Sequence, residues 1–376
     1  MLLPLIAGVA LVVSTVWCVA GLIAVFRVTR SRPAPLPTEQ LPAVSVLKPL
    51  CGSDPNLLAN LESFFEQDHG DFELLFGVVD EADPALAAVR AARARHPEIA
   101  CRVIVHSGHG ASNPKVDNLL GLLPQAKHDL VLVSDSNVRA PRHYLRELAA
   151  LYVEQRPGLV TNLFSGSDEA SLGGALESVE LAGFCAPGVA LPTLLGDPLL
   201  VGKSALFSRR RFEQLGGFQR LRDVLAEDFV MGKTFAHAGD AIVIAPTVLA
   251  NVVGKLSVRS ALRRHLRWSM LRFRLRPVAA ALEPFTNPLA LLPVAWYLLG
   301  PWALAWAAAC WLFRDAGSWL VLRGAERVWL PLLLSPLRDA LSLGVWVVAP
   351  LKHHVSWRGK RFRLGAGTLL YSEQAR

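Results

Sequence analysis

The 376-residue sequence is poor in charge and in cysteine. Only 19% of its residues are charged, 52% are hydrophobic and the mean hydropathy is +0.35, which argues against a disordered chain and against a purely soluble enzyme. The five cysteines show no Cys-x-x-Cys spacing, so the sequence gives no sign of a zinc ribbon or of a disulfide framework. A chain without disulfides fits a reducing compartment, and we expect its globular part in the cytoplasm.

Positive charge is concentrated in three short stretches. Residues 27–32, 257–276 and 352–363 together hold 15 basic residues and no acidic one. Because the net charge of the whole chain is +8, the remainder carries −7. Each basic stretch borders a long apolar run, a pattern typical of proteins oriented in a lipid bilayer, and we therefore expect no nucleic acid partner.

Three apolar runs are long enough to cross a bilayer, which needs about 20 residues in a helix. Residues 1–26 and 288–313 contain no charged side chain, and residues 328–351 contain only Arg338 and Asp339. Basic residues follow the first run and do not precede it. This order predicts a transmembrane helix and not a cleaved signal, with the N-terminus outside and residue 27 onward in the cytoplasm.

The second and third apolar runs each contain an interruption. Gly300-Pro301 predicts a kink, which neighbouring helices can tolerate within a membrane. Arg338-Asp339 is either a functional charge pair inside the bilayer or an ion pair between packed helices. The basic tail that follows is expected in the cytoplasm, which favours an even number of C-terminal spans.

These features divide the chain into six segments. A linker with four prolines separates the first helix from a segment of ordinary globular composition, and a basic segment with leucines at helical spacing precedes the C-terminal helices. The predicted segments are an N-terminal transmembrane helix at 1–26, a Pro-rich linker at 27–42, a cytoplasmic catalytic domain at 43–256, an amphipathic interfacial helix region at 257–287, C-terminal transmembrane helices at 288–351 and a basic cytoplasmic tail at 352–376.

The globular segment alternates strands and helices. Strands are predicted at 44–49, 72–79, 102–106 and 130–134. Helices are predicted to begin at Asp54-Pro55, with Asp54 as the N-cap, and at Pro84. This alternation predicts parallel βαβ units in an open α/β sheet, where ligands bind beyond the carboxyl ends of the strands. Asp80 and Asp135 each follow a strand, so we expect their carboxylates to meet at one crevice.

Three acidic clusters carry the main chemical signal, namely Asp80 to Asp83, Asp135 and Glu227-Asp228. A single aspartate after a strand is often a turn residue, but three clusters in one α/β domain are less easily explained by turns. One carboxylate can accept hydrogen bonds from a nucleobase or a ribose. A second can hold a divalent metal that grips a diphosphate, and a third can act as a general base on an incoming hydroxyl.

A fourth element, Arg264-x-x-Arg267-Trp268, lies in the most basic stretch. On a helix Arg264 and Arg267 share a face, so both guanidinium groups could clamp a departing diphosphate. The same stretch alternates apolar residues with seven arginines, which is typical of an amphipathic helix on a membrane surface. Different arginines can serve each purpose.

Together these motifs resemble the D, D, D, (Q/R)xxRW signature of membrane-bound family 2-like glycosyltransferases, and more closely the ceramide glucosyltransferase family. The resemblance extends from the first apolar run to the tail. The matching stretches are Val46 to Leu50, Asp54 to Leu57, Asn60 to Phe65, Asp83-Pro84, Asn113 to Leu119, Ala226 to Phe229 and Ser356 to Leu364.

The resemblance implies a GT-A fold flanked by transmembrane helices, and an inverting transfer of a hexose from a UDP-sugar to a hydroxyl of a membrane lipid. It implies the following site residues: Asp228 as catalytic base; Asp80, Asp83, Lys115 and Asp135 in binding the nucleotide-sugar; and Arg264, Arg267 and Trp268 at the leaving group and acceptor. Asp135 is also the implied ligand of a divalent metal, Mg²⁺ or Mn²⁺.

Two departures from the family pattern leave the metal and the acceptor open. The second motif is Asp135-Ser136-Asn137 and not Asp-x-Asp, so one metal carboxylate stands where many relatives have two. Gly202-Lys203-Ser204 also differs, and is similar to a bacterial hopanoid-associated subgroup thought to add N-acetylglucosamine to a polycyclic lipid. The acceptor is thus a ceramide or a hopanoid-type lipid, and the bacterial resemblance implies the inner membrane.

An alternative from another class is a non-enzymatic membrane transport protein that binds a nucleotide. It explains the apolar runs and a nucleotide crevice. It gives no purpose to Asp228 or to Arg264-x-x-Arg267-Trp268 beside that crevice.

Overall fold

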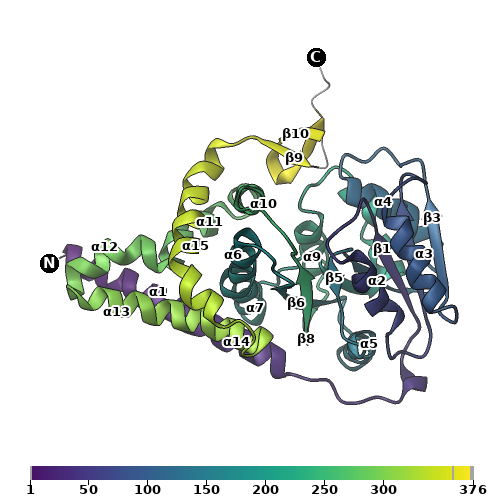
Figure 1. Ribbon diagram of the computed structural model, residues 1–376, viewed down its shortest axis with the longest axis horizontal. Coiled ribbons are helices and arrows are strands. Elements are labelled where there is room, and N and C mark those ends of the chain that lie inside the picture. The colour runs from purple at the N-terminus through teal and green to yellow at the C-terminus, as the bar shows by residue number, and fades with distance from the viewer. Residues whose placement is uncertain (1, 358–359, 373–376) are drawn as a thin grey trace.

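The structure, a computed structural model, describes residues 2–357 and 360–372. It has three parts, namely an α/β domain, an arm of apolar helices and a small C-terminal sheet (Figure 1). The arm projects to one side and contains the N-terminal end of the chain, and the C-terminal sheet lies against the domain. The domain follows the linker, which is irregular apart from a short turn at Thr38–Gln40.

An eight-stranded mixed sheet forms the centre of the domain, with the order β3-β2-β1-β4-β7-β6-β8-β5. The strands are β1 (Val44–Pro49), β2 (Phe72–Val78), β3 (Cys101–Val105), β4 (Leu130–Ser134), β5 (Val138–Arg139), β6 (Leu159–Ser167), β7 (Ser204–Ser208) and β8 (Ile242–Val252). Strand β1 pairs in parallel with β2 and β4, β2 with β3, and β6 with β8, while β7 and β5 pair antiparallel. The predicted α/β fold with a mostly parallel sheet is confirmed.

Helices cover both faces of this sheet. On one face α2 (Leu57–Phe65), α3 (Ala85–Arg95) and α5 (Tyr144–Gln155) pack on Val44 and Val46 of β1. On the other face α4 (Pro114–Leu122), α8 (Arg209–Gln214) and α9 (Glu227–His237) pack on Leu47. Strands β1, β2 and β4 are buried along their whole length, as expected for strands covered on both sides.

The four predicted strands occur within one residue of their expected bounds. The predicted start of the first helix is wrong, since α2 begins at Leu57 after Asn56, which has a φ of 53°. Asp54 is therefore not a helix cap. Its carboxylate accepts a hydrogen bond from the Ser136 hydroxyl, at the carboxyl edge of the sheet.

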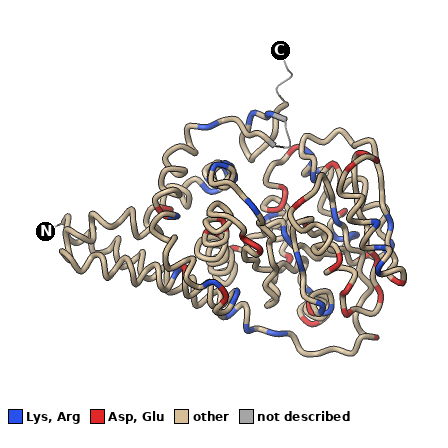
Figure 2. Tube along the Cα trace, in the orientation of Figure 1, with Lys and Arg blue, Asp and Glu red and all other residues tan. Residues whose placement is uncertain are grey.

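The apolar arm consists of α1 (Leu2–Arg30) and a helical hairpin. The run 288–313, predicted as one kinked span, is broken at Gly300 into α12 (Pro288–Leu299) and α13 (Trp302–Trp311). Gly300 has a φ of 55°, which favours glycine and turns the chain back on itself (Figure 1). Figure 2 shows that the outer part of the arm carries no charged residue.

The remaining helices connect the arm to the domain. They are α6 (Leu172–Glu180), α7 (Ala186–Leu194), α10 (Val258–Leu275), α11 (Pro277–Leu282), α14 (Ser318–Arg323) and α15 (Trp329–Val348). Helix α6 passes into α7 through a π-helical turn at Leu181–Cys185, and α13 passes into α14 through another at Leu312–Gly317. Helix α1 packs against both α7 and α14.

Three helical stretches are long and apolar enough to cross a membrane, namely Leu2–Arg30, Leu172–Leu194 and Trp329–Leu351. A fourth is added if the bent pair Pro277–Thr286 and Pro288–Leu299 is taken as one span. Leu172–Leu194 is 78% buried within the protein, so it is also an element of the core. At the start of α15, Arg327 donates a hydrogen bond to the Glu169 carbonyl in the domain.

Arg338 and Asp339 belong to a buried network of charges at the base of the arm, where α15 packs on the π-helical turn that follows α13. Arg314 contacts Asp315 and Asp339 at 2.8 Å each, and Arg338 contacts Asp315 at 2.7 Å and Asp339 at 3.1 Å. All four side chains are nearly inaccessible to solvent. Because each charge meets a partner of opposite sign, the structure supports the second reading of Arg338-Asp339, an ion pair between packed helices.

The tightest glycine in this region generates a stability prediction. A Cβ on Gly183 would lie 1.8 Å from Asp315 Oδ1, whereas a Cβ on Gly188 in α7 would meet open space. We expect Gly183→Ala to lower the free energy of unfolding by about 3 kcal/mol, because Asp315 must move away from its arginines. Gly188→Ala should be neutral or slightly stabilising. Equal midpoints of thermal unfolding for the two variants in detergent would contradict this packing.

Candidate active site

A cleft of about 370 Å³ opens at the carboxyl edge of the sheet. It is bordered by the ends of β1 and β4, the segment before β7, and the helices α4, α9 and α10. This is the edge where open α/β sheets bind their ligands. The predicted site residues that line it are Lys115, Asp135, Asp228, Arg264, Arg267 and Trp268.

Asp135 follows β4 and is held by two lysines. Its Oδ1 lies 2.8 Å from Lys115 Nζ, and its Oδ2 lies 2.9 Å from Lys203 Nζ. Lys115 also contacts Glu227 Oε1 at 3.1 Å. Burial alone would raise the pKa of Asp135, but the two ammonium groups outweigh it and hold that pKa well below its ordinary value. Asp135 is therefore a permanent anion with two permanent partners.

Asp228 lies in the first turn of α9 and accepts two backbone hydrogen bonds. Gly202 N donates to its Oδ2 and Phe229 N donates to its Oδ1, each at 2.7 Å. A Cβ on Gly202 would lie 2.8 Å from Lys115 Nζ and 3.1 Å from Asp228 Oδ2, so a larger residue here would displace the ammonium group of Lys115. Burial and the charge of Asp228 raise the pKa of the neighbouring Glu227, although Lys115 opposes them.

Helix α10 places Arg264, Arg267 and Trp268 on the side of the cleft. Arg264 Nη1 lies 2.8 Å from Glu177 Oε1, and His265 Nε2 lies 2.9 Å from Glu177 Oε2. Glu177, on α6, is completely buried. Within residues 2–357 and 360–372, Arg267 pairs with no carboxylate. Its guanidinium is therefore available to an anionic ligand.

Part of the apolar side of α10 packs on protein, and the interfacial position of this helix stays a prediction. Met270 packs with Val355 and Phe362 of the C-terminal sheet, made of β9 (His354–Trp357), β10 (Lys360–Leu364) and β11 (Leu370–Ser372). Within the tail stretch Ser356 to Leu364, Arg358 and Gly359 lie outside the described residues. The tail also holds the loop before Glu227, because Leu225 N donates to the Thr368 carbonyl at 2.9 Å.

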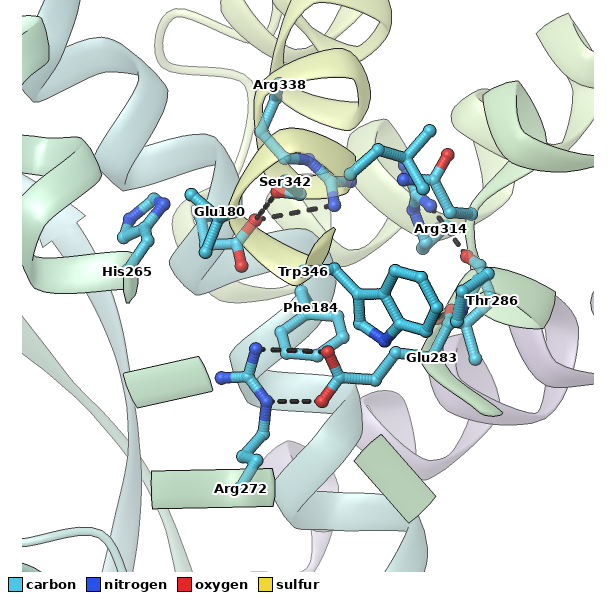
Figure 3. Close-up of a pocket in the computed structure, with 14 residues that line it drawn as sticks. Glu180, Phe184, His265, Arg272, Glu283, Thr286, Arg314, Arg338, Ser342 and Trp346 are labelled. Carbon is cyan, nitrogen blue, oxygen red and sulfur yellow. Dashed lines mark hydrogen bonds and ion pairs between the residues drawn. The ribbon is translucent and has the colours of Figure 1, made fainter. Parts of the chain in front are cut away.

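A second, much smaller cavity lies behind α10, between α6 and α15 (Figure 3). Figure 3 shows Glu180 pointing toward Arg338 and Ser342, and Arg272 facing Glu283. Its volume is about 40 Å³, room for little more than a water molecule. The charged groups around this cavity are paired with one another. They form a row of polar contacts between α10 and the buried charges at the base of the arm.

Asp80 and Asp83 do not line the cleft. Asp83 accepts hydrogen bonds from Gly52 N at 3.0 Å and Ala85 N at 2.8 Å, and Asp80 is exposed and accepts one from Ala82 N at 2.8 Å. The expected meeting of Asp80 with Asp135 stays a prediction, and both carboxylates of this segment accept hydrogen bonds from backbone N–H groups. Asp83 still holds the loop at Gly52, beside the cleft residue Cys51.

Three residues of the site have no role in the sequence prediction. They are Lys48, Glu177 and Lys203. Lys48 is fully buried over the ring of Phe64 and donates to the Asp135 carbonyl at 2.8 Å. A signal existed for Glu177, since it and Glu180 are the only charged residues in the apolar stretch 172–194. For Lys203 the only signal was its departure from the family pattern.

The residues around Asp135 do not fit a divalent cation as they are arranged. Both carboxylate oxygens meet ammonium groups, and the neighbouring Asn137 supplies a neutral amide in place of a second carboxylate. Among the described residues, no three His, Cys, Asp or Glu side chains lie together as a metal centre. The metal expected at Asp135 thus has no ready set of ligands.

The open α/β sheet and this cleft define a GT-A-type glycosyltransferase. The chain belongs to glycosyltransferase family 21, whose family model matches residues 6–370. It is 26% identical to ceramide glucosyltransferase 1 of Caenorhabditis elegans over 342 residues, 88% of this chain and 73% of that protein. It is also 26% identical to ceramide glucosyltransferase 3 of the same organism, over 87% of this chain and 74% of the relative.

A solved structure with the same fold is that of the mannosyltransferase PcManGT from Pyrobaculum calidifontis, in complex with GDP-Man and Mn²⁺. The two share 19% sequence identity and a TM-score of 0.53, over 92% of this chain and 98% of the other. At this identity the likeness concerns the fold, and it confirms the predicted GT-A class.

The buried position of Glu177 predicts how α10 is held. We expect Glu177→Gln to lower the free energy of unfolding by about 2 kcal/mol, because Arg264 and His265 lose a charged acceptor. The exposed Glu213 on α8 provides the matched control, Glu213→Gln, which should leave stability unchanged. A midpoint of thermal unfolding that is the same for both variants would show that Glu177 does not hold α10.

The same contact predicts a pH dependence. Burial lowers the pKa of His265, but the Glu177 hydrogen bond and charge outweigh it and raise that pKa above 6.5. A histidine whose pKa is raised in the folded protein makes its full contribution to stability at a pH below its ordinary pKa. That contribution is lost as the pH rises through the pKa that the histidine has in the folded protein. We expect the free energy of unfolding of the native protein to fall as the pH rises from the ordinary pKa of histidine through the raised pKa of His265. In His265→Gln it should change less over the same range of pH. A steeper fall in the variant would be the contrary result.

Proposed function

We propose that this glycosyltransferase moves a hexose from a UDP-sugar to a hydroxyl of a membrane lipid, with inversion at the anomeric carbon. The observation that carries the proposal is the single cleft that holds Asp228 opposite Arg264, Arg267 and Trp268. A base and an anion clamp are the two groups that such a transfer requires. The similarity to ceramide glucosyltransferases favours UDP-glucose as donor and a ceramide-type acceptor, and hence a role in sphingolipid metabolism.

Asp228 is proposed as the catalytic base. Each of its oxygens accepts one backbone N–H and retains a lone pair for an acceptor hydroxyl. As the hydroxyl oxygen attacks the anomeric carbon, its proton passes to Asp228 and the bond between that carbon and the diphosphate breaks. The electron pair leaves with UDP, and the guanidinium of Arg267 meets the new charge. No covalent intermediate with the enzyme is needed.

The donor is proposed to bind along the carboxyl edge of the sheet. Lys115 and Asp135 lie at the diphosphate position, and the loop held by Asp83, with Asp80 beside it, is at the nucleoside side. The family pattern favours Mg²⁺ or Mn²⁺ at Asp135, and such an ion would neutralise the diphosphate. Because the residues present do not fit it, the steps above use only groups of the chain.

The lining of the cleft is partly polar and partly apolar. Asp135, Lys115 and Lys203 supply polar lining, while Phe164, Leu181, Val201, Trp268 and Leu271 supply apolar lining. This suits an acceptor with a hydroxyl on a large apolar body. Each CH₂ exposed to water costs about 0.8 kcal/mol, so such a lipid must be met at the bilayer.

The apolar arm, whose outer part carries no charged residue, is proposed to anchor the protein in that bilayer, with the domain on the cytoplasmic side (Figure 2). The basic ends of α1 and α10 both lie next to the domain, as the positive-inside rule requires. In bacteria this would be the inner membrane.

A second candidate is transfer of N-acetylglucosamine from UDP-GlcNAc to a hopanoid lipid, in hopanoid biosynthesis. The observation that favours it is Lys203, the residue that departs from the ceramide pattern, in the wall of the cleft. A non-enzymatic transport protein is not supported, since the chain belongs to a glycosyltransferase family.

The proposal is tested by UDP release with the detergent-extracted protein, UDP-glucose or UDP-GlcNAc, and ceramide or hopanoid acceptors. We expect Asp228→Asn to lower kcat by about 1000-fold, because the general base is lost. The control is Asp71→Asn, an exposed residue at the opposite edge of the sheet. Full turnover by Asp228→Asn would remove the proposed base. If no UDP-sugar is consumed with any lipid, the transferase proposal itself fails.

A further inference from the structure

The lysine pair at Asp135 carries an inference that rests on the proposed function and goes beyond it. We propose that the ammonium group of Lys203 takes the place of a divalent metal and, with Arg267, binds the diphosphate of the donor. The enzyme then transfers sugar without a divalent metal. Lys203 is on this proposal a further substrate-binding residue of the cleft.

The first support is the occupancy of Asp135. A divalent cation at a strand-end aspartate bonds directly to a carboxylate oxygen. Here Lys115 Nζ lies 2.8 Å from Oδ1 and Lys203 Nζ lies 2.9 Å from Oδ2, so two single positive charges already stand where one double charge would bind. An added dication would meet repulsion from both ammonium groups.

The second support is Asn137, which is built as a neutral partner of Lys203. Its amide nitrogen donates to Asn251 Oδ1 at 3.0 Å, which turns its own Oδ1 toward the cleft. That oxygen accepts a hydrogen bond from Lys203 Nζ at 2.9 Å. The residue that in an Asp-x-Asp motif would be a second carboxylate therefore orients a lysine.

The third support is a count of donors. An ammonium group has three N–H donors. Lys115 directs its three at Asp135, Glu227 and the Gly202 carbonyl, whereas Lys203 has two acceptors, Asp135 and Asn137. Lys203 thus retains one donor, and its side chain is partly open to the cleft.

Arg267 is the second cation with unused donors, because within the described ranges no carboxylate pairs with it. Burial and the charge of Arg264 lower the pKa of Arg267, although the charges of Glu177 and Glu227 oppose them. A diphosphate between Lys203 and Arg267 would receive one ammonium and one planar guanidinium contact. It would also supply the anion that Arg267 lacks.

The test measures kcat/KM for UDP release with the best donor and acceptor, in excess EDTA and in excess Mn²⁺. We expect the native enzyme to keep its kcat/KM within twofold in EDTA. Lys203→Met should lose at least 100-fold in EDTA and regain at least tenfold with Mn²⁺, because the freed carboxylate can then hold the ion. Lys203→Arg should retain more activity than Lys203→Met, since it keeps the positive charge.

The control variant is Lys127→Met, whose exposed side chain lies before β4, at the opposite edge of the sheet from Asp135. It should match the native enzyme in both buffers. Calorimetric binding of UDP to the native protein in EDTA gives a readout that does not depend on turnover, and we expect it to weaken at least tenfold in Lys203→Met.

Two results would overturn this inference alone. The first is native activity that falls more than tenfold in EDTA and returns with Mn²⁺. The second is a Lys203→Met enzyme that equals the native one in EDTA. In both cases UDP-sugar is still consumed, so the proposed function stands. Absence of turnover under every metal condition would instead contradict the proposed function.

Discussion

The geometry of the cleft depends on one buried contact, in which the Glu177 carboxylate on α6 holds Arg264 and His265 on α10. It fixes the helix that carries the anion clamp against the sheet domain. Beyond Glu177 the same chain enters the π-helical turn whose Gly183 lies against Asp315, the centre of the charge network at the base of the arm. Glu177 and Gly183 thus link α10 to the base of the apolar arm, and if the arm is anchored as proposed, the membrane also positions the wall of the cleft that α10 forms.

Two carboxylates of the cleft have different surroundings and therefore different chemistry. Asp135 is neutralised by two ammonium groups, which makes it a weak base and a rigid holder of cations. Asp228 accepts hydrogen bonds from the backbone of Gly202 and Phe229, and these orient it without neutralising its charge. Because Gly202 N donates to Asp228 and Lys203 contacts Asp135, a single short loop lies between the residue proposed at the diphosphate and the residue proposed as the base.

The features that could be predicted from the sequence are those that depend on residues close together in the chain. Strands β1 to β4 were found because buried β-branched runs are visible residue by residue, and Asp228 and Arg267 because their motifs are short. The contact of Asp83 with the loop at Gly52 could not be predicted from local patterns, because it joins two separate segments. The same is true of the packing of α10 on Val355, which is distant in sequence. Lys203 was seen as a difference, but its partner Asp135 lies 68 residues away and is set by the antiparallel pairing of β7 with β4.

That pairing also bears on the lipid. Gly202 and Lys203 directly precede β7 at the edge of the sheet, and Val201, just before them, lies with Phe164 and Trp268 in the apolar lining of the cleft. The residue that would contact the diphosphate is thus two positions from one that would contact the acceptor. On the two proposals, the contact with the acceptor and the contact with the diphosphate come from one short loop, so a substitution that moves Val201 would also displace Lys203.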